Sequence, residues 1–506
     1  MFWNFIIYSI ISYEGRIKFM KNSNLSVLFI NTSPYSRMSK LNSISHPLGV
    51  MSLASYVREN GFSNVKILDR NASPSDDTLY EILKSHSPKV IAISCMNFTS
   101  KEMMRIAKVC KTILPHSIVV TGGPYVNSVE AESLNCEDVD ISIYGEGELT
   151  ILDIVQKVSN KEILKGIDGT FERDQSGEVI KNPQREYIQD LDQLPDPAYD
   201  LIDLEFYNSR TSMSEMGIRP YMTLFSSRAC PYHCTYCHDI FGKTFRGMSA
   251  ERMVAQIELL IEKYGIRDFE FVDDIWNFDH NRVRKFCKLV IEKELNIVWH
   301  FPNGVRGDLF FEDELILMKK AGCKSMSFAI ESNNRRIQKV TKKNLRIKKI
   351  TKNIDIATRE GIFTIGFFMI GFPNESLKEI LRTCWYIVRS PLCVAYISQP
   401  IPFEKTELRE EIEDLKGDLD APHKSLDHNY SQISNRSLMI IMFITNMLFY
   451  LNIWRIYKII TTFPSLKLLT INLIKFLGLL VFRDDEFDKK LPTQAFERFR
   501  LFLQKM

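Results

Sequence analysis

Residues 226–246 read SSRACPYHCTYCHDIFGKTFR and hold three cysteines in the spacing Cys-x3-Cys-x2-Cys. These are Cys230, Cys234 and Cys237. Three thiolates so close in sequence can bind three corners of one iron–sulfur cluster and leave the fourth iron open to an outside ligand. Zinc is the competing metal, but a closed zinc site needs a fourth protein ligand, for which His233 and His238 are the nearby candidates. An odd number of cysteines in so short a span argues against disulfide pairing. We therefore interpret the three cysteines as cluster ligands.

This spacing, with the aromatic Tyr236 directly before the last cysteine, resembles the motif of the radical S-adenosylmethionine (SAM) superfamily. The resemblance implies a 4Fe–4S cluster whose open iron binds the amino and carboxylate groups of SAM. It also implies that an electron from the cluster cleaves SAM to methionine and a 5′-deoxyadenosyl radical. Tyr236 is then expected to lie against the cofactors.

Composition sets broad limits on the protein. With 506 residues, of which 45% are hydrophobic and 25% charged, the chain predicts a globular protein of more than one domain. A net charge of +3 without a basic cluster gives no sign of a nucleic-acid-binding protein. Ten scattered cysteines suit a reducing cytoplasm better than secretion.

Residues 1–23 are interpreted as an N-terminal extension. The apolar run at 2–11 lacks the charged start and cleavage site of a signal peptide and is too short to cross a bilayer. Because a strand pattern follows soon after Met20, we hypothesise that translation begins at that methionine.

Residues 24–160 alternate short apolar runs with amphipathic stretches, which predicts a doubly wound parallel sheet. The expected strands are 27–30, 65–68, 90–94, 117–121 and 141–144, and the clearest helices are 48–60, 77–85 and 100–113. Ligands of such sheets bind beyond the carboxyl ends of the strands.

Two of the loops there are rich in glycine, TGGP at 121–124 and GEGE at 145–148. Together with HPLGVMSLASYVRENG at 46–61, they resemble the cobalamin (B12)-binding Rossmann-like domain that precedes many radical SAM domains. The resemblance implies that the loops receive cobalamin, since glycine lets the backbone approach a large flat ligand. The candidate residues are Gly122, Gly123, Gly145, Glu146 and Gly147. For any single glycine, an ordinary tight turn is the alternative.

One position departs from the cobalamin pattern. Many such domains offer cobalt a histidine from D-x-H-x-x-G, but this chain reads Asp69-Arg70-Asn71 at the matching place. Asn71 thus stands where the histidine would be, and a domain that has lost cobalamin stays an alternative.

Residues 161–215 include a Pro-containing stretch and are expected to form a linker. Residues 216–405 again alternate strands with helices, which predicts a six-stranded partial β/α barrel with the cysteine loop after its first strand. The expected strands are 221–225, 268–272, 298–301, 325–329, 363–370 and 394–399. Cys287 and Cys323 lie on apolar helix faces or ends and are expected in the core.

Polar residues or glycine follow each barrel strand, and the resemblance gives some of them roles. It implies that Asp273 and Asp274 lie near the SAM amino group, and that Arg306 and Glu331 contact its carboxylate or ribose. It also implies that the Gly371 backbone approaches adenine. A helix cap or a surface ion pair is the alternative for each.

Residues 406–506 are expected to be helical. The apolar runs 438–454 and 466–482 both contain polar residues, so buried or interfacial helices are favoured over a membrane hairpin.

The resemblance as a whole implies a cobalamin-dependent radical SAM enzyme. The implied reaction is methylation of an unactivated carbon or phosphinate phosphorus in a small molecule, through methylcobalamin and the 5′-deoxyadenosyl radical, with electrons from an external flavodoxin- or ferredoxin-type reductase. A cyclase, ring-rearranging or oxidative enzyme with the same cofactors is the alternative. If the protein is not an enzyme, the alternative is a non-catalytic iron–sulfur or zinc-binding module.

Overall fold

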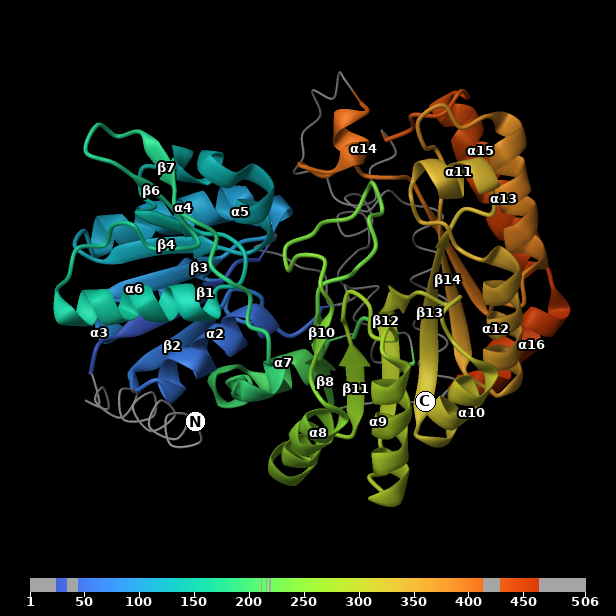
Figure 1. Cartoon of the computed structure of the whole chain (residues 1–506), viewed down its shortest axis with the longest axis horizontal. Helices are drawn as coiled ribbons and strands as arrows, with labels where there is room; N and C mark the ends of the chain where they lie inside the picture. Colours follow the sequence, from blue (N-terminus) through green and yellow to red (C-terminus); the bar gives the residue numbers. More distant parts are fainter. Residues whose placement is uncertain are drawn as a thin grey trace, which may run out of the picture. The chain divides into compact units, whose positions relative to one another are not determined.

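The computed structural model describes residues 24–33, 44–210, 212–214, 216–217, 220–412 and 428–463. These residues form two compact units (Figure 1). Within the described residues, the first unit holds 24–33 and 47–204, and the second holds 44–46 and those from 205 onward. The expected extension at 1–23 lies outside the described residues.

The first unit is built on a seven-stranded sheet in the order β2-β1-β3-β4-β5-β6-β7. Its strands are β1 (Val27–Asn31), β2 (Val65–Asp69), β3 (Val90–Ser94), β4 (Ile118–Gly122), β5 (Ile141–Ile143), β6 (Thr170–Arg173) and β7 (Val179–Lys181). Strands β1 to β5 are parallel, and β6 and β7 are antiparallel. The predicted parallel sheet is confirmed.

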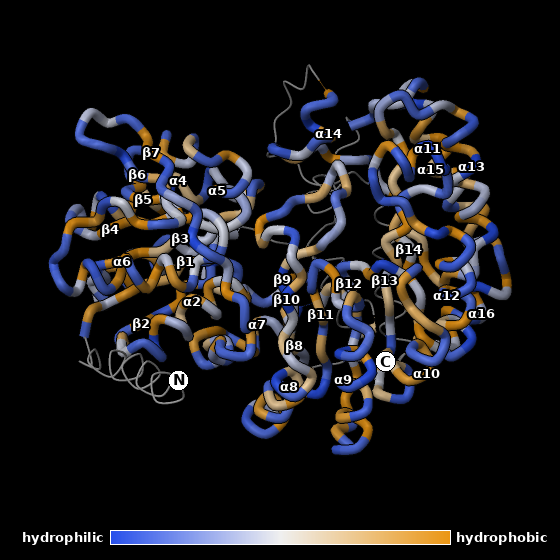
Figure 2. The backbone as a smooth tube through the Cα atoms, in the orientation of Figure 1, coloured by the Kyte–Doolittle hydropathy of each residue, from blue (hydrophilic) through white to orange (hydrophobic). Residues whose placement is uncertain are grey.

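Helices cover both faces of this sheet because successive residues of a strand point to opposite faces. Val27 and Phe29 belong to one core, and Leu28 and Ile30 belong to the other. Helices α2 (Leu48–Glu59) and α6 (Glu148–Asn160) close the first core, and α3 (Asp76–His86) and α4 (Ser100–Ile113) close the second. Figure 2 shows the hydrophobic colour of β4 between these layers.

The segment 161–215 is more than the expected linker, because it adds β6 and β7 to the edge of the sheet. Phe171 of β6 is fully buried, so the strand gains apolar contact as well as a hydrogen-bonded neighbour. The Pro-containing stretch is also fixed, since Ala198 N donates to Met51 O of α2 at 3.1 Å.

The second unit contains a six-stranded sheet in the order β15-β14-β13-β12-β11-β8, parallel throughout. Its strands are β8 (Tyr221–Leu224), β11 (Asp268–Phe271), β12 (Val298–Val305), β13 (Cys323–Glu331), β14 (Phe363–Met369) and β15 (Val394–Ser398). Helices α8 (Ala250–Tyr264), α9 (His280–Glu292), α10 (Glu312–Lys320), α12 (Ile347–Arg359) and α13 (Leu377–Arg389) alternate with them. The predicted partial barrel is confirmed, although β12 and β13 are longer than expected. Cys287 and Cys323 are fully buried.

Beyond the barrel, the chain forms α14 (Glu407–Glu410), α15 (Asn435–Tyr450) and α16 (Ile453–Thr462). The apolar run expected at 438–454 is broken, because the Asn452 side chain accepts from Trp454 N and Arg455 N and starts a new helix. The run expected at 466–482 lies outside the described residues. No single described helix has both the length and the hydropathy to cross a bilayer; α15 and α16 meet the test only as a pair bent by 72°.

Candidate active site

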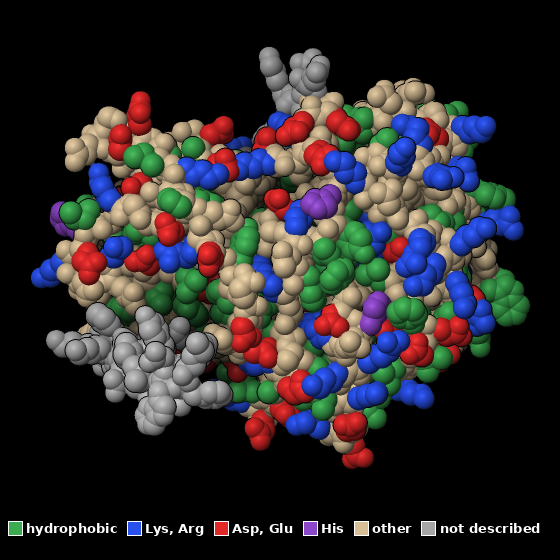
Figure 3. All heavy atoms as spheres, viewed as in Figure 1, with side chains coloured by type: hydrophobic (Ala, Val, Ile, Leu, Met, Phe, Trp, Pro, Cys, Tyr) green, Lys and Arg blue, Asp and Glu red, His purple; other side chains and the backbone are tan. Residues whose placement is uncertain are grey.

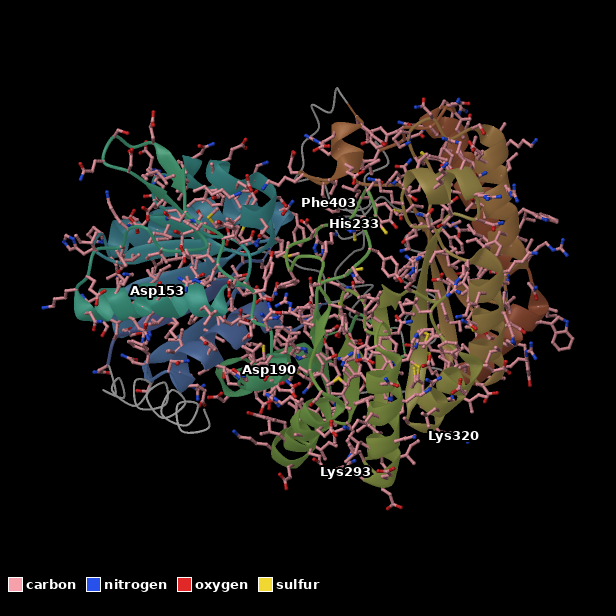
Figure 4. All side chains as sticks on the ribbon, viewed as in Figure 1. Asp153, Asp190, His233, Lys293, Lys320 and Phe403 are labelled. Carbon is pink, nitrogen blue, oxygen red and sulfur yellow. The ribbon has the colours of Figure 1, made fainter. Side chains whose placement is uncertain are left out.

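The cysteine loop starts where β8 ends and is closed by a small hairpin. Strand β9 (Ser227–Arg228) pairs with β10 (Arg246–Gly247) in antiparallel register, so residues 229–245 form a loop with fixed ends. His233 of this loop lies at the opposite end of the barrel from Lys293 and Lys320, which precede strands (Figure 4). The loop therefore lies at the carboxyl ends of the strands, as predicted.

Hydrogen bonds from distant segments hold the middle of the loop. Thr235 N donates to Thr341 O at 3.1 Å, and Leu408 N donates to Thr235 O at 2.9 Å. Within the loop, Cys237 N donates to Cys234 O at 3.1 Å. The loop is thus shaped by the protein itself, which is the preorganisation that a bound cofactor needs.

The three sulfurs lie close enough to affect one another. Burial raises the pKa of Cys230, and the neighbouring Cys234 raises it further. Although Cys237 is exposed as a residue, its thiol is enclosed, and burial raises its pKa to about 12. Thiolates at such positions need nearby positive charge, which iron supplies.

Lys343 supplies positive charge from the protein and was missed in the sequence. Its Nζ lies 3.3 Å from Glu331 Oε1 and 6.0 Å from the centroid of the Tyr236 ring. Burial disfavours the charged amine, but Glu331, Cys234 and Cys237 outweigh burial, and its pKa lies above the usual value. The pair Lys342-Lys343 follows the short helix α11 (Arg335–Val340), and nothing in the sequence tells which lysine faces the cysteines.

Tyr236 and Glu331 are brought to the same place, as predicted. The Tyr236 hydroxyl is buried without an oxygen or nitrogen partner among the described residues, and the Cys234 sulfur lies beside it. Glu331 has a φ of +64°, a strained conformation that recurs at functional sites.

Asp273 is hydrogen-bonded to the start of the cysteine loop. Its carboxylate accepts hydrogen bonds from Ser226 N at 3.1 Å, Ser226 Oγ at 2.8 Å and Ser227 Oγ. Arg282 of α9 binds Ser226 O at 3.0 Å and adds its charge beside the carboxylate. Asp273 and Arg282 therefore anchor the first residues of the cysteine loop.

Asp274 faces the loop more openly. Its Oδ1 lies 3.8 Å from His238 Nε2, and its charge acts on Cys230 and Cys237. Burial raises the pKa of Asp274, and the neighbouring Asp273 adds to the rise.

Arg306 also reaches the cysteine loop. Its guanidinium lies over the ring of Tyr232 at 3.7 Å from the centroid, a cation–π contact. Its Nε lies 3.2 Å from Asp308 Oδ1, so part of its charge is already neutralised.

Gly371 is occupied by protein groups. With a φ of +101°, it donates from N to Glu375 Oε2 at 2.8 Å, and its carbonyl accepts from Tyr430 N at 2.9 Å. A Cβ at this position would meet Leu438 Cδ2 at 3.2 Å. The N–H and the carbonyl of Gly371 are therefore both hydrogen-bonded within the protein.

In the first unit, the carboxyl ends of β1, β3 and β4 are joined by hydrogen bonds. Thr32 Oγ1 donates to Ser94 O at 2.8 Å and contacts Thr99 Oγ1 at 2.7 Å. A Cβ on Gly123, whose φ is +95°, would lie 2.9 Å from Cys95 O, so only glycine fits there. The strand order β2-β1-β3-β4-β5 puts the switch point between β1 and β3, where doubly wound sheets bind ligands.

The other predicted residues of this edge are held in different ways. Gly122 ends β4, and Gly145 N donates to Asn127 Oδ1 at 2.8 Å. Glu146 Oε2 accepts from Ile188 N at 2.8 Å, which ties down the chain after β7. A Cβ on Gly147 would meet Leu53 Cδ2 of α2 at 3.0 Å, so α2 packs closely on this glycine.

The place of the missing cobalt-binding histidine is filled by protein contacts. Asp69 Oδ1 accepts from Asn31 Nδ2 at 2.9 Å and from Asn71 N at 3.1 Å. Arg70 is buried and binds Asp76 and Glu102. Asn71 cannot replace histidine as a cobalt ligand of similar basicity.

The donor set fits an iron–sulfur cluster. Among the described residues, no three side chains of His, Cys, Asp or Glu converge as the ligands of one metal ion. A cluster binds each thiolate at a separate iron, and three neighbouring thiols beside Lys343 meet that need.

Comparisons with known proteins agree with this geometry. A family model described as "B12 binding domain" matches residues 37–155, and one described as "Radical SAM superfamily" matches residues 224–385.

An uncharacterised methyltransferase of Pyrococcus horikoshii is 31% identical over 368 residues, which cover 72% of this chain and 78% of that protein. The cytidylyl-2-hydroxyethylphosphonate methyltransferase of Streptomyces wedmorensis is 26% identical, covering 76% of this chain and 81% of the relative. The anaerobic magnesium-protoporphyrin IX monomethyl ester cyclase of Rubrivivax gelatinosus is 23% identical, covering 71% and 65%.

A solved structure of the cobalamin-dependent SAM radical enzyme OxsB, with aqua-cobalamin and SAM bound, has the same fold with a TM-score of 0.65. It is 17% identical, and the match covers 83% of this chain and 61% of that one. The chain therefore belongs to the radical SAM superfamily, among the enzymes that carry a B12-binding domain and use a 4Fe–4S cluster, SAM and cobalamin.

Proposed function

We propose that this enzyme is a methyltransferase that acts on an unactivated carbon or phosphinate phosphorus of a small molecule. The observation that carries the proposal is the cysteine loop, clamped at the carboxyl end of β8 beside Lys343, in a chain that also holds a B12-binding domain. Two methyltransferases among the relatives span most of the chain and support the choice of reaction. When bound, the cluster supplies the electron that cleaves SAM, and cobalamin supplies a carrier for the methyl group.

The protein's own side chains would bind and orient these groups. Cys230, Cys234 and Cys237 would hold three irons, and Lys343 would offset the negative charge of the thiolates. Asp274 and Arg306 would orient the charged end of SAM, because both act on the cysteine loop from neighbouring strands.

In the first unit, the loops after β1 and β3 would receive cobalamin, with Gly122, Gly123 and Gly145 at the same edge of the sheet. With Asn71 at the histidine position, the protein would give cobalt no imidazole from that loop.

A cyclase or another ring-rearranging enzyme is the second candidate, because one relative of similar coverage is a cyclase. The two candidates differ in what becomes of SAM. Transfer of the SAM methyl group leaves S-adenosylhomocysteine, whereas reductive cleavage alone leaves 5′-deoxyadenosine.

We also infer an external reductase and a cytoplasmic setting. The reductase is inferred because the cluster takes up electrons one at a time. The cytoplasmic setting is inferred because an oxygen-sensitive cluster is best kept in a reducing compartment.

The test is anaerobic reconstitution of the full-length chain with iron, sulfide and cobalamin, followed by SAM and dithionite. We expect about four irons per chain, one bound cobalamin, and both 5′-deoxyadenosine and S-adenosylhomocysteine. Cys234→Ala should lose the cluster and 5′-deoxyadenosine, while Cys136→Ala, a half-buried cysteine of the first unit, should keep them. 5′-Deoxyadenosine without any S-adenosylhomocysteine would favour the second candidate, and an intact cluster in Cys234→Ala would overturn the assignment of the loop.

A further inference from the structure

The second unit carries a broad apolar surface on three helices that the proposed reaction does not use. Of the large hydrophobic side chains exposed among the described residues, twelve lie between Met439 and Ile460 and three lie on α13. We call the exposed hydrophobic side chains of α13, α15 and α16, with Leu451 between the last two, the apolar face. Its members include Leu381, Trp385, Ile440, Phe443, Leu451 and Trp454.

Helix α15 is apolar on both sides. Its inner side, with Leu438, Ile441 and Met442, packs on Ile380 and Cys384 of α13. Its outer side exposes residues of the same kind, with Ile440 50% and Phe443 53% exposed. A surface helix of a water-facing protein has a polar outer side, whereas a helix that is apolar all round has a second apolar environment. A contiguous exposed surface made of many large hydrophobic side chains marks an interaction site.

The bend between α15 and α16 is built into the protein. Buried Arg455 lies over the Phe449 ring at 3.5 Å and donates to Phe449 O, at the end of α15. The same guanidinium donates to Ser390 O at 2.8 Å and to Leu392 O at 2.9 Å, after α13. Ile459 of α16 then packs on the barrel core. Because these bonds fix the 72° bend, the pair lies along the surface of the unit and cannot straighten into one spanning helix without losing them.

The charges around the apolar face are almost all positive. Helices α13, α15 and α16 contain six basic residues and one acidic residue, Glu379, which is paired with Arg336 at 2.6 Å. Five of the basic residues, Lys378, Arg382, Arg389, Arg436 and Lys458, reach the surface and form the basic border, whereas Arg455 is buried. Lys378 and Arg382 are exposed directly beside Leu377 and Leu381. Figure 3 shows blue and green side chains together over α12, α13 and α16, at the right-hand edge.

We propose that the apolar face docks the enzyme on the surface of an anionic lipid bilayer, with α15 and α16 lying in the interface and the basic residues of α13 against the headgroups. An apolar outer side, exposed tryptophan and tyrosine, and a basic border are the features of helices that lie in a membrane interface. Trp454, 75% exposed, and Tyr457, 61% exposed, provide the aromatic groups that prefer this depth. A basic border favours anionic lipid over a second copy of this chain, since two copies would bring like charges together.

The first experiment is flotation of the full-length, cluster-loaded protein with vesicles under anaerobic conditions. We expect it to float with vesicles of phosphatidylcholine and phosphatidylglycerol and to float less with phosphatidylcholine alone. Added salt should weaken binding to the anionic vesicles, because it screens the basic border. Absence of flotation with anionic vesicles would overturn the proposal.

Matched variants locate the binding surface. Ile440→Glu with Phe443→Glu should reduce the bound fraction at least about tenfold. Ile163→Glu, which changes a 77% exposed isoleucine of the first unit in the same way, should bind like the wild type. Equal loss in both variants would overturn the assignment of the face. Cluster content and thermal unfolding show whether each variant is folded.

Tryptophan fluorescence gives a test that does not depend on these variants. The chain has five tryptophans; Trp276 and Trp299 are buried, but Trp385 of the same face is also exposed, so the spectrum of Trp454→Phe is subtracted from that of the wild type to isolate Trp454. Its emission should shift to the blue with anionic vesicles and be quenched by brominated lipid. Light scattering without lipid should show a monomer; a dimer that Ile440→Glu with Phe443→Glu converts to a monomer would assign the face to a second copy and overturn the proposal.

Discussion

The ammonium group of Lys343 lies 3.3 Å from the carboxylate of Glu331, and the charge of Lys343 also acts on Cys234 and Cys237. The lysine comes from the loop after α11, and the glutamate ends β13. A positive charge at this place stabilises negative charge on the cysteine loop, and a reduced cluster carries one more negative charge than an oxidised one.

Lys343→Met should therefore make the cluster harder to reduce. We expect a more negative reduction potential and slower SAM cleavage. A tenfold less favourable one-electron reduction of the cluster corresponds to a shift of about 60 mV. Lys342→Met is the matched control, because Lys342 is 49% exposed and pairs with Glu407 at the surface. A redox titration followed by electron paramagnetic resonance measures the potential. Equal reduction potentials in the two variants would show that Lys343 does not act on the cluster.

Asp273 and Asp274 are adjacent in sequence but should respond differently to substitution. Asp273→Asn replaces one acceptor oxygen by a donor among Ser226 N, Ser226 Oγ and Ser227 Oγ, so we expect a loss of about 1–3 kcal/mol in the free energy of unfolding. Asp274→Asn should change unfolding by less than about 0.5 kcal/mol and instead weaken SAM binding. Urea denaturation and SAM titration separate the two effects, and identical behaviour would contradict these roles.

The sequence predicts the two sheets well because each strand is a short apolar run before a loop of small or polar residues. The Cys-x3-Cys-x2-Cys spacing likewise predicts the position of the cysteine loop, since ligand spacing is a local property. Local pattern does not predict β6 and β7, because their place depends on Phe171 meeting a core formed by residues far away in the chain.

The roles of single rim residues are harder to predict, since they depend on partners from other elements. The two aspartates after β11 look equivalent in sequence, yet only Asp273 is within reach of Ser226, 47 residues away. Lys343 belongs to no recognisable motif and becomes part of the site only because the loop after α11 folds back toward Glu331. In both cases the decisive contact is tertiary.

Glu375 should give stability an unusual dependence on pH. Burial raises its pKa from 4.5 to about 7, although the N–H groups of Gly371 and Phe372 favour the charged form. The folded protein therefore holds this proton more tightly than the unfolded chain, and stability should fall as pH rises from 4.5 through 7, by up to about 3 kcal/mol.

Glu375→Gln should remove this dependence, because its amide oxygen can accept both N–H groups and its uncharged NH2 replaces Oε1, which has no hydrogen-bond partner among the described residues. Glu379→Gln is the control, because the pKa of Glu379 is lowered in the folded protein whereas that of Glu375 is raised. Hydrogen bonding to Arg336 lowers the pKa of Glu379 in the folded protein to about 2. In the unfolded chain its pKa is the usual value for Glu of about 4.3. This carboxylate is therefore charged in both the folded and the unfolded state between about pH 5 and 8. Denaturation midpoints across that range should fall with pH in the wild type and in Glu379→Gln but not in Glu375→Gln. Midpoints that fall in parallel with pH in all three proteins would contradict the role of the buried Glu375 carboxyl.

Gly123→Ala tests the edge of the first unit where cobalamin is proposed to bind. The new Cβ would lie 2.9 Å from Cys95 O and 3.2 Å from Cys95 N, both backbone atoms, at a φ of +95°. Gly177→Ala has nearly the same backbone strain, with a φ of +90°, but no heavy atom of the residues that the structure describes lies within 4 Å of its Cβ. We expect Gly177→Ala to cost about 1 kcal/mol, within the range for a left-handed residue, and Gly123→Ala to cost more because β3 and β4 must separate. Only Gly123→Ala should also lower the cobalamin bound per chain, measured by absorbance after reconstitution, while its iron content stays unchanged. Loss of iron and cobalamin together would mean that the substitution unfolds the whole chain, and unchanged cobalamin would exclude this edge from the binding site.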